Sequence, residues 1–250
     1  MARTRNSPLH LARRALRKPA LVVPYIRRRI RNRRIRAEAT SHPDFYRGVM
    51  ADWVTTQGPN FAVGTPDEDQ WLALGRRQFR YLKANGLKPH HRMLEIGCGN
   101  LRAGWRFIRY LDAGNYTGID ISPEILLAAR ETIVERGLED KRPVTMLASG
   151  TGLESLPSDW FDVAHAHSVF SHTPLDVIEG YLSDMRRVLK PTGFFDFTYN
   201  ATDGETWDFL EEDYYFRTKV LIEAAAKHGF DAVTMPDWDH PQAKLRLRPV

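Results

Sequence analysis

The pattern of hydrophobic positions changes character near residue 92. From there onward, short apolar runs alternate with stretches in which apolar side chains recur every three or four positions. The short runs predict strands at Met93–Ile96, Tyr116–Ile119, Val144–Leu147, Asp162–Ala166, Gly193–Thr198, Ala232–Met235 and Lys244–Leu247. Helices are predicted near residues 101–111, 123–136, 174–189 and 214–228. This alternation predicts an α/β fold with a doubly wound, seven-stranded sheet, mostly parallel, and helices on both faces. Because no helix separates the last two strands, they are predicted to form a terminal antiparallel hairpin.

Two further regions precede the predicted sheet, and together they divide the chain into residues 1–40, 41–90 and 91–250. Residues 41–90 are predicted to form a helical cap. Within it, Asp67 is placed to cap a helix that ends near Asn85 and Gly86, and its apolar face is formed by Trp71, Leu72, Leu74, Phe79 and Leu82. Residues 1–40 are predicted to form a basic arm, partly disordered or amphipathic.

Charge is distributed unevenly between the arm and the remainder of the chain. Residues 1–36 contain thirteen Arg or Lys and no acid; subtracting thirteen from the 36 basic residues leaves 23 against 31 acidic ones. A mildly acidic globular part therefore carries a strongly basic arm. A charge split of this kind indicates that the arm has a phosphate-bearing or membrane-surface partner. An anionic membrane surface is the first expectation, and RNA or a partner subunit are the alternatives.

Composition says more about where the protein is located in the cell than about any reaction that it catalyses. Hydrophobic residues make up 42% and charged residues 27% of the chain, values typical of a globular protein with a packed core. The sequence shows neither an apolar run long enough to span a bilayer nor a secretory signal. Cys98 is the single cysteine, so an internal disulfide and a multi-cysteine zinc site are excluded. We therefore expect a cytoplasmic protein, peripheral on the inner membrane surface where the arm binds lipid. No cluster of metal ligands stands out, so no metal is expected.

The first predicted strand runs into a glycine-containing loop, Glu95-Ile96-Gly97-Cys98-Gly99-Asn100. Glycines after a strand let the backbone turn tightly and let a ligand approach closely. The dinucleotide pattern G-x-G-x-x-G fails because Arg102 occupies the third glycine position. Asp120 lies 21 residues beyond Gly99, at the carboxyl end of the second strand. A carboxylate at that place accepts hydrogen bonds from the ribose hydroxyls of a nucleoside cofactor.

These motifs resemble those of class I, Rossmann-like, S-adenosylmethionine-dependent methyltransferases. The first motif of that family is similar to E/D-x-G-x-G-x, and an acidic residue ends its second strand. The resemblance continues through Trp160-Phe161-Asp162-Val163 and through the segment from Arg187 to Gly193, and it covers roughly residues 87–250. Thr192 departs from the pattern, because the family usually has a second glycine there. Ala148-Ser149-Gly150 also departs, because the family often has an acid followed by a small residue.

The resemblance implies S-adenosyl-L-methionine as the cofactor and assigns it a set of residues. It places Glu95 at the methionine end, Gly97 and Gly99 beneath the cofactor, Asp120 at the ribose and Ser149 at the adenine. Cys98 is expected to be a small packing residue within the cofactor loop. The full set of expected cofactor contacts is Glu95, Gly97, Cys98, Gly99, Asn100, Asp120, Ile121, Ser149 and His167.

Three histidines follow the fourth predicted strand, where the active sites of open α/β sheets gather. Alternation places His165 and His167 on the same face, and His165 is expected to pack within the sheet. His167 occupies a position that lies against the methionine portion in the family. His172 matches the histidine of V-[LF]-x-H in small-molecule O-methyltransferases that resemble this chain. We therefore predict His172, together with His167, as catalytic, with His172 the general base that removes a hydroxyl proton.

The acceptor is predicted less directly than the cofactor. Aromatic and amide side chains suit a sugar-containing, phenolic or lipid-linked acceptor, and the candidate contacts are Tyr199, Asn200, Trp207, Tyr214 and His240. His240 belongs to the polar loop Trp238-Asp239-His240-Pro241, which is placed to close over the site. The predicted function is methyl transfer to a hydroxyl. Two alternatives stay open, an RNA methyltransferase recruited by the arm and a cofactor-binding scaffold without catalysis.

Overall fold

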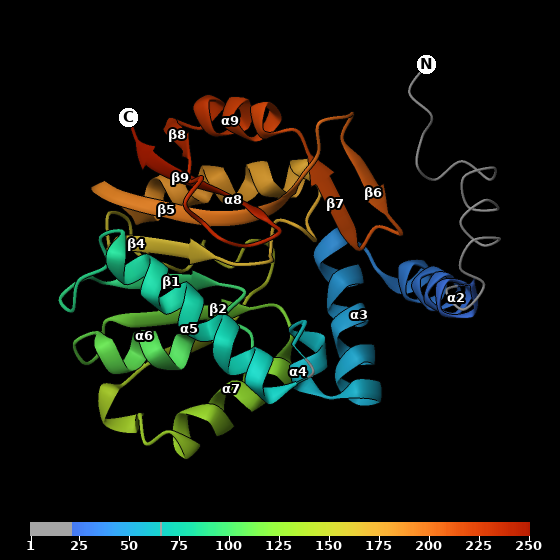
Figure 1. Cartoon of the computed structure of the whole chain (residues 1–250), viewed down its shortest axis with the longest axis horizontal. Coiled ribbons are helices and arrows are strands. Elements are labelled where there is room, and N and C mark those ends of the chain that lie inside the picture. Colours follow the sequence, from blue (N-terminus) through green and yellow to red (C-terminus); the bar gives the residue numbers. More distant parts are fainter. Residues whose placement is uncertain (1–21, 66) are drawn as a thin grey trace.

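The computed structural model describes residues 22–65 and 67–250 (Figure 1). Nine strands are found in the described residues: β1 (Met93–Ile96), β2 (Tyr116–Asp120), β3 (Val144–Leu147), β4 (Phe161–Ala166), β5 (Leu189–Ala201), β6 (Trp207–Phe209), β7 (Asp213–Phe216), β8 (Phe230–Thr234) and β9 (Ala243–Pro249). The α-helices are α2 (Val22–Glu38), α3 (His42–Gln57), α4 (Pro59–Ala62), α5 (Glu68–Ala84), α6 (Gly104–Tyr110), α7 (Pro123–Glu135), α8 (Leu175–Val188) and α9 (Thr218–Lys227).

Strands β1 to β5 form a parallel sheet in the order β3-β2-β1-β4-β5. Strand β9 pairs antiparallel with β5, and β8 pairs antiparallel with β9, so the predicted terminal hairpin is confirmed. All seven predicted strands are present in this arrangement. Because these strands are parallel, the carboxyl ends of β1, β2 and β4 lie at the same edge of the sheet. The strand order reverses at β1, since β2 and β3 lie on one side of it and β4 and β5 on the other.

Strands β6 and β7 were not predicted from the sequence. They pair antiparallel with each other, and β7 extends the carboxyl end of β5 in parallel. As a result the predicted helix over 214–228 begins later, at Thr218, because residues 213–216 are a strand. Within this hairpin the Tyr215 ring stacks on Trp207, its partner in the strand register, with ring centroids 4.0 Å apart.

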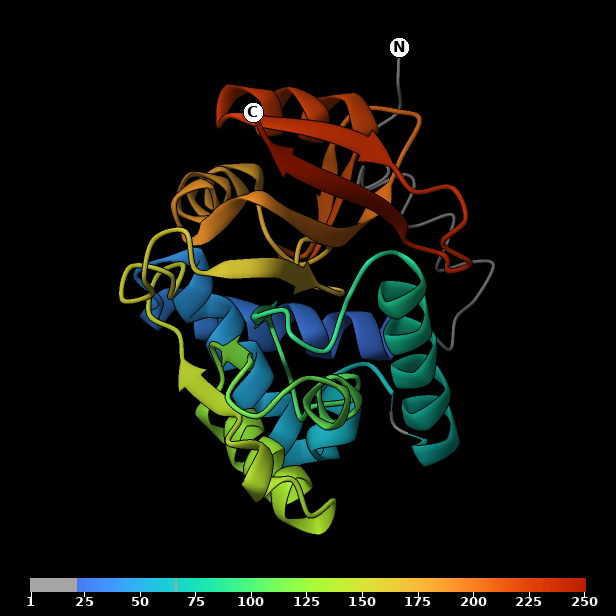
Figure 2. The same ribbon diagram turned by 90° about the vertical axis from the view of Figure 1, so that its left-hand side faces the viewer.

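Helices cover both faces of the sheet (Figures 1 and 2). On one face the side chains of α8 and α9 join a large apolar cluster that contains Phe170, Phe195 and Phe197. On the other face α5, α6 and α7 contribute Leu82, Phe107 and residues of α7 to a second cluster. Because both faces of the sheet are covered, β1 and β4 are buried along most of their length, including the polar Glu95 and His165.

Helices α2, α3 and α4 lie beside the edge at which the strands end (Figure 1). Helix α3 begins at the N-cap Ser41, whose hydroxyl accepts the Asp44 N–H, and α5 begins at Asp67, as predicted. Helix α2 is continuous, because Pro24 lies in its first turn, where a missing N–H costs no hydrogen bond. The predicted basic arm thus contains a helix from Val22, and residues 1–21 of that arm lie outside the described residues. No helix within the described residues is long and apolar enough to cross a membrane.

Candidate functional site

A cavity of about 530 Å³ lies at the carboxyl ends of β1, β2 and β4. Its floor comes from the loops after these strands, and its other wall from α3, α4 and α5. The lining residues from the sheet side include Glu95, Gly97, Cys98, Gly99, Asn100, Asp120, Ile121, Ala148, His167 and His172. A volume of this size fits a nucleoside cofactor together with a small acceptor, since ligand pockets commonly measure about 300–1,000 Å³.

The loop after β1 has the backbone geometry that its glycines predict. Gly97 and Gly99 have φ angles of +62° and +58°, a region in which residues with a side chain are strained. A Cβ atom at Gly97 would lie 2.4 Å from Cγ2 of Val169, and one at Gly99 would lie 3.0 Å from Cγ1 of Val63. The backbone here therefore forms a cradle that larger residues would fill.

Asp120 lies at the end of β2, directly below this loop. One carboxylate oxygen accepts the backbone N–H of Gly99 at 2.9 Å, and the other accepts that of Ser122 at 3.0 Å. Burial raises the pKa of Asp120, although these backbone hydrogen bonds oppose the shift. Each oxygen keeps a further lone pair for a ligand hydroxyl. The N-cap of α7 is Ser122, whose hydroxyl accepts the Ile125 N–H, so the Asp120 carboxylate does not cap this helix.

Glu95 is a buried carboxyl at the end of the cavity nearest α6. Burial raises its pKa to about 8, while the hydrogen bond from the Tyr116 hydroxyl and the charge of Arg102 oppose the shift. The Nε atom of Arg102 is buried and has no hydrogen-bond partner among the described residues. A buried carboxyl and a buried guanidinium therefore face the same end of the cavity, a pairing suited to a ligand that carries both an ammonium and a carboxylate group.

His167 lies on the opposite wall, 6% exposed, and both of its ring nitrogens lack a partner among the described residues. Burial lowers the pKa of His167 well below its usual value, so the ring is neutral near pH 7. His240 lies beside it, with ring centroids 5.1 Å apart, and also lines the cavity. His165 packs inside the fold against Gln78 and Phe107, as expected.

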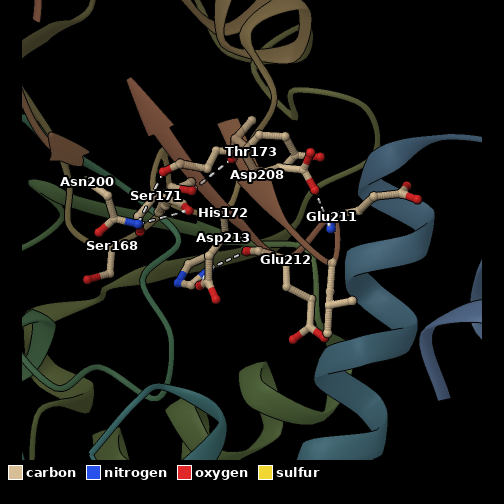
Figure 3. Close-up of polar contacts among 12 residues, drawn as sticks. Ser168, Ser171, His172, Thr173, Asn200, Asp208, Glu211, Glu212 and Asp213 are labelled. Carbon is tan, nitrogen blue, oxygen red and sulfur yellow. Dashed lines mark hydrogen bonds and ion pairs between the residues drawn. The ribbon is translucent and has the colours of Figure 1, made fainter. Parts of the chain in front are cut away.

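His172 is held by the segment that begins β7 (Figure 3). Its Nδ1–H donates to the backbone carbonyl of Glu212 at 2.7 Å, and the same nitrogen lies 3.2 Å from Oδ1 of Asp213. Burial alone would raise the pKa of Asp213, but His172 and Arg28 together lower it. With Nδ1 fixed as the donor, Nε2 is the basic nitrogen of the ring. Tyr46 stacks on the imidazole, with ring centroids 5.2 Å apart.

The basic helix α2 supports this arrangement from behind. The Arg28 guanidinium donates to Glu212 at 2.7 Å and to Asp213 at 3.0 Å, and Arg31 and Asn32 also donate to Glu212. The Glu212 side chain is fully buried, so its charge depends on these donors. Part of the basic arm is therefore a structural neighbour of the predicted catalytic histidine.

Comparison with known proteins identifies the domain around this cavity. Residues 94–195 match a family described as Methyltransferase domain. A protein named Probable methyltransferase ltbC, from Aspergillus luteorubrus, is 30% identical over 155 residues, which are 60% of this chain and 51% of that protein. The sterol 24-C-methyltransferase ERG6B of Gibberella zeae is 31% identical over 139 residues, which are 54% of this chain and 35% of that protein. The chain thus spans about half the length, or less, of these curated relatives.

Residues 94–195 are therefore a methyltransferase domain, and the fold around it is similar to that of class I, S-adenosylmethionine-dependent methyltransferases. Its fold is similar to that of magnesium protoporphyrin IX methyltransferase from Synechocystis PCC 6803, solved with bound SAM, with a TM-score of 0.61 at 15% identity over 82% of this chain and 97% of the other. The [4+2]-cyclase SpnF reaches the same TM-score of 0.61 at 18% identity, over 82% of this chain and 97% of that one. At 15% and 18% identity these similarities show a shared fold and nothing about the reaction.

Most of the site residues predicted for the methyltransferase domain line its cavity. They are Glu95, Gly97, Cys98, Gly99, Asn100, Asp120, Ile121, His167, His172 and His240. Cys98 is buried, and burial raises its thiol pKa well above the usual value, in keeping with a packing residue. Their roles toward a ligand stay predictions.

Five predicted contacts lie elsewhere. Ser149 is exposed beyond the end of β3, and Ala148 takes its place in the cavity wall, because the chain turns outward after that strand. The four predicted acceptor contacts that do not line the cavity belong to β5, β6 and β7, which lead away from it: Tyr199, Asn200, Trp207 and Tyr214. Tyr199 bonds the Thr218 hydroxyl of α9, and Asn200 donates to the Tyr214 carbonyl, so these polar groups join β5 to α9 and to β7.

The sequence interpretation missed the cavity residues that come from the N-terminal helices. They are His42, Pro43, Tyr46, Met50, Trp53, Phe61, Leu74 and Gln78. These residues sit on α3, α4 and α5, far in sequence from the cofactor motif. Apolar and polar residues are mixed along α3, so its sequence shows no helical period that would separate a cavity wall from a packed face. Arg102 was noted for breaking the dinucleotide pattern and not as a buried cation at the site.

Proposed function

We propose that this protein transfers a methyl group from S-adenosyl-L-methionine to a hydroxyl group of a small molecule, with His172 as the general base. The observation that carries the proposal is the contact between Nδ1 of His172 and the Glu212 carbonyl, which can only accept, so that this nitrogen of the ring carries the proton. The Nδ1–H is fixed on this carbonyl beside Asp213, and the residue lines the same cavity as Asp120 and Gly97. A base oriented by a second group, next to a nucleoside site, suits proton removal from an acceptor.

The residues present fit the cofactor. The left-handed backbone at Gly97 and Gly99, which has no side chains, leaves room for close approach, and Asp120 keeps acceptor capacity for ribose hydroxyls. Glu95 and Arg102 suit the ammonium and carboxylate of the methionine end. When bound, the cofactor supplies an electrophilic methyl group. His167, neutral and without a polar partner in the described structure, would contact the methionine portion or the acceptor from the opposite wall.

The chain's own contribution to catalysis is alignment and proton removal. Alignment of two reactants in one cavity supplies a large part of the rate of a displacement reaction. As the acceptor oxygen forms its new bond, its proton passes to Nε2 of His172. Asp213 stabilises the resulting imidazolium, since its carboxylate lies 3.2 Å from Nδ1. Tyr46 keeps the ring plane fixed through stacking.

An acceptor with a substantial apolar body is supported by the cavity wall. Met50, Trp53, Phe61, Val177 and Tyr181 supply apolar surface there, and two of the curated relatives are named sterol methyltransferases. We therefore propose a lipid-linked acceptor, with sugar-containing and phenolic compounds as the other classes to screen.

The first test is calorimetric titration with S-adenosylmethionine and S-adenosylhomocysteine. Wild type is expected to bind with micromolar affinity, and Asp120→Ala is expected to lose binding by at least about tenfold. Asp203→Asn, a charge change on an exposed loop, serves as the matched control and should bind normally. A folded wild type that binds neither compound refutes the cofactor assignment.

The second test measures transfer of a labelled methyl group to sterols, glycosides, phenols and RNA. Product with a hydroxyl compound, lost by about a hundredfold in His172→Ala, supports the proposal. Methylation of RNA instead would establish the RNA alternative. Cofactor binding without transfer to any of these acceptors would favour the scaffold.

A further inference from the structure

Helix α2 has two faces of different character. Its inner face packs on the protein: Ile35 contacts Gly48 of α3, Tyr25 lies 5.9 Å from Phe209 in ring-centroid distance, and Arg28 and Arg31 reach Glu212. These contacts fix the helix in one orientation around its own axis. The opposite face therefore points to solvent in a defined way.

The outer face carries an apolar stripe. Val23, Ile26 and Ile30 are large hydrophobic side chains that are 55%, 48% and 64% exposed. Their spacing of three and four residues places them on one line, since each residue advances about 100° around a helix. Exposed β-branched side chains in a row are costly in water, because each keeps apolar surface hydrated.

Arginines border this stripe on both sides. At about 100° per residue, Arg27 and Arg34 fall along one edge, and Arg29 and Arg33 fall along the other. All four are exposed. Within residues 22–65 and 67–250 none of them takes part in an ion pair, whereas Arg28, Arg31 and Arg36 do. The free charge of the helix is therefore gathered around its apolar line.

We propose that the outer face of α2 docks on an anionic lipid bilayer. An apolar stripe flanked by arginines is the arrangement of a helix that lies in the membrane interface, where apolar side chains enter the acyl boundary and guanidinium groups reach lipid phosphates. The apolar line distinguishes this surface from one built for nucleic acid, since RNA phosphates offer nothing for Val23, Ile26 and Ile30 to bury against. The docking does not depend on the proposed methyl transfer.

The position of α2 connects docking with the cavity. Arg31 lies over the ring of Trp53 at 5.2 Å from its centroid, and Trp53 lines the cavity together with Phe61, which is 38% exposed. Arg31 belongs to the inner face of α2, so a bilayer docked on the outer face is separated from this wall by the thickness of the helix, about 10 Å. Docking would therefore hold the cavity near the membrane surface, with α2 between the lipid and the α3 wall.

The test is sedimentation of the full chain with vesicles of phosphatidylcholine mixed with phosphatidylglycerol, compared with pure phosphatidylcholine vesicles. Wild type is expected to bind the mixed vesicles only, and less at high salt. Ile26→Ser with Ile30→Ser should weaken binding by at least about tenfold, because two apolar side chains no longer enter the interface. Arg27→Gln with Arg34→Gln should weaken it by roughly 25-fold, about fivefold for each charge.

Matched controls separate this face from general effects of charge and hydrophobicity. Leu127→Ser with Val134→Ser removes two exposed apolar side chains of α7, and Arg76→Gln with Arg80→Gln removes two exposed charges of α5. Both should bind as wild type does. Full binding by the Ile26 and Ile30 variant overturns the proposal and assigns any lipid binding to residues outside this face. Equal binding of wild type to neutral and anionic vesicles overturns it as well. So does a parallel RNA-binding measurement in which the α2 variants lose RNA binding but keep vesicle binding.

Discussion

Cofactor binding should depend on the protonation of Glu95. This carboxyl is 4% exposed, and burial raises its pKa to about 8 against the hydrogen bond from Tyr116. In the absence of a ligand it is therefore mostly neutral at physiological pH. The proposed function places a cofactor ammonium at this end of the cavity, and an ammonium favours the ionised carboxylate. Binding should consequently release a proton from Glu95.

The size of the effect follows from the pKa. At about pH 6 a carboxyl with a pKa of about 8 must be ionised at a cost of about 2.7 kcal/mol before it can pair with the ammonium, since each pH unit corresponds to about 1.4 kcal/mol. If binding requires the ionised form, affinity should increase about tenfold for each unit by which the pH rises toward 8, or roughly a hundredfold from pH 6 to pH 8. Above pH 8 this contribution levels off.

Calorimetric titration of S-adenosylhomocysteine at several pH values, in two buffers that differ in ionisation enthalpy, measures both the affinity and the protons released. Wild type should release close to one proton at about pH 6, and Glu95→Gln should release none while its affinity varies little with pH. Glutamine keeps the side-chain shape and can still bond the Tyr116 hydroxyl, which limits structural change. A wild-type affinity that is flat between pH 6 and pH 8, or a Glu95→Gln variant with the same slope, would refute the reasoning.

Further predictions concern stability and turnover. Because the pKa of Glu95 is raised in the folded state, the stability that this group contributes is fully present below its ordinary pKa of 4.5 and is lost as the pH rises through 8. The thermal midpoint of Glu95→Gln, measured by scanning calorimetry, should therefore exceed that of wild type by an amount that grows with pH, and a difference that shrinks with pH would contradict this. Burial lowers the pKa of Lys244 to about 8, so the free energy of unfolding of wild type should rise as the pH increases from 8 to 10.5. In urea titrations Lys244→Met should remove this pH dependence and raise the free energy of unfolding at pH 7 by on the order of 3 kcal/mol, whereas a lower value at that pH would count against the reasoning. Asp213→Asn should lower kcat about a hundredfold with little change in cofactor affinity, and Arg28→Gln about tenfold, whereas an unchanged kcat in both would remove Asp213 from the mechanism.

The cofactor half of the site was predictable from the sequence because its parts are local. Gly97 and Gly99 stand directly after a buried strand, and Asp120 ends the next one, so strand–turn–helix geometry places them together without reference to the remaining chain. Ser149, by contrast, does not line the cavity. The path of the chain after β3 depends on what packs around it, and here Ala148 faces inward while Ser149 is exposed.

The acceptor half depended on contacts between distant segments. His172 was predicted from its own motif, but its partners Glu212 and Asp213 follow about 40 residues later, in a hairpin that periodicity did not reveal. Tyr199 and Asn200 of β5, and Trp207 and Tyr214 of this hairpin, do not line the cavity. Their polar and aromatic character suited an acceptor equally well, so residue type alone could not distinguish the two roles.

By itself, the sequence determined the alternation of strands and helices, the loop from Glu95 to Asn100 and the position of Asp120, because each arises from periodicity or from neighbours along the chain. The tertiary structure decided which helices close the cavity, and it brought Arg28 to Glu212 across 184 residues. It also turned part of a charge run into a two-faced helix, with an apolar line left in solvent. Burial and pairing between distant residues depend on the assembled core, and no local pattern encodes them.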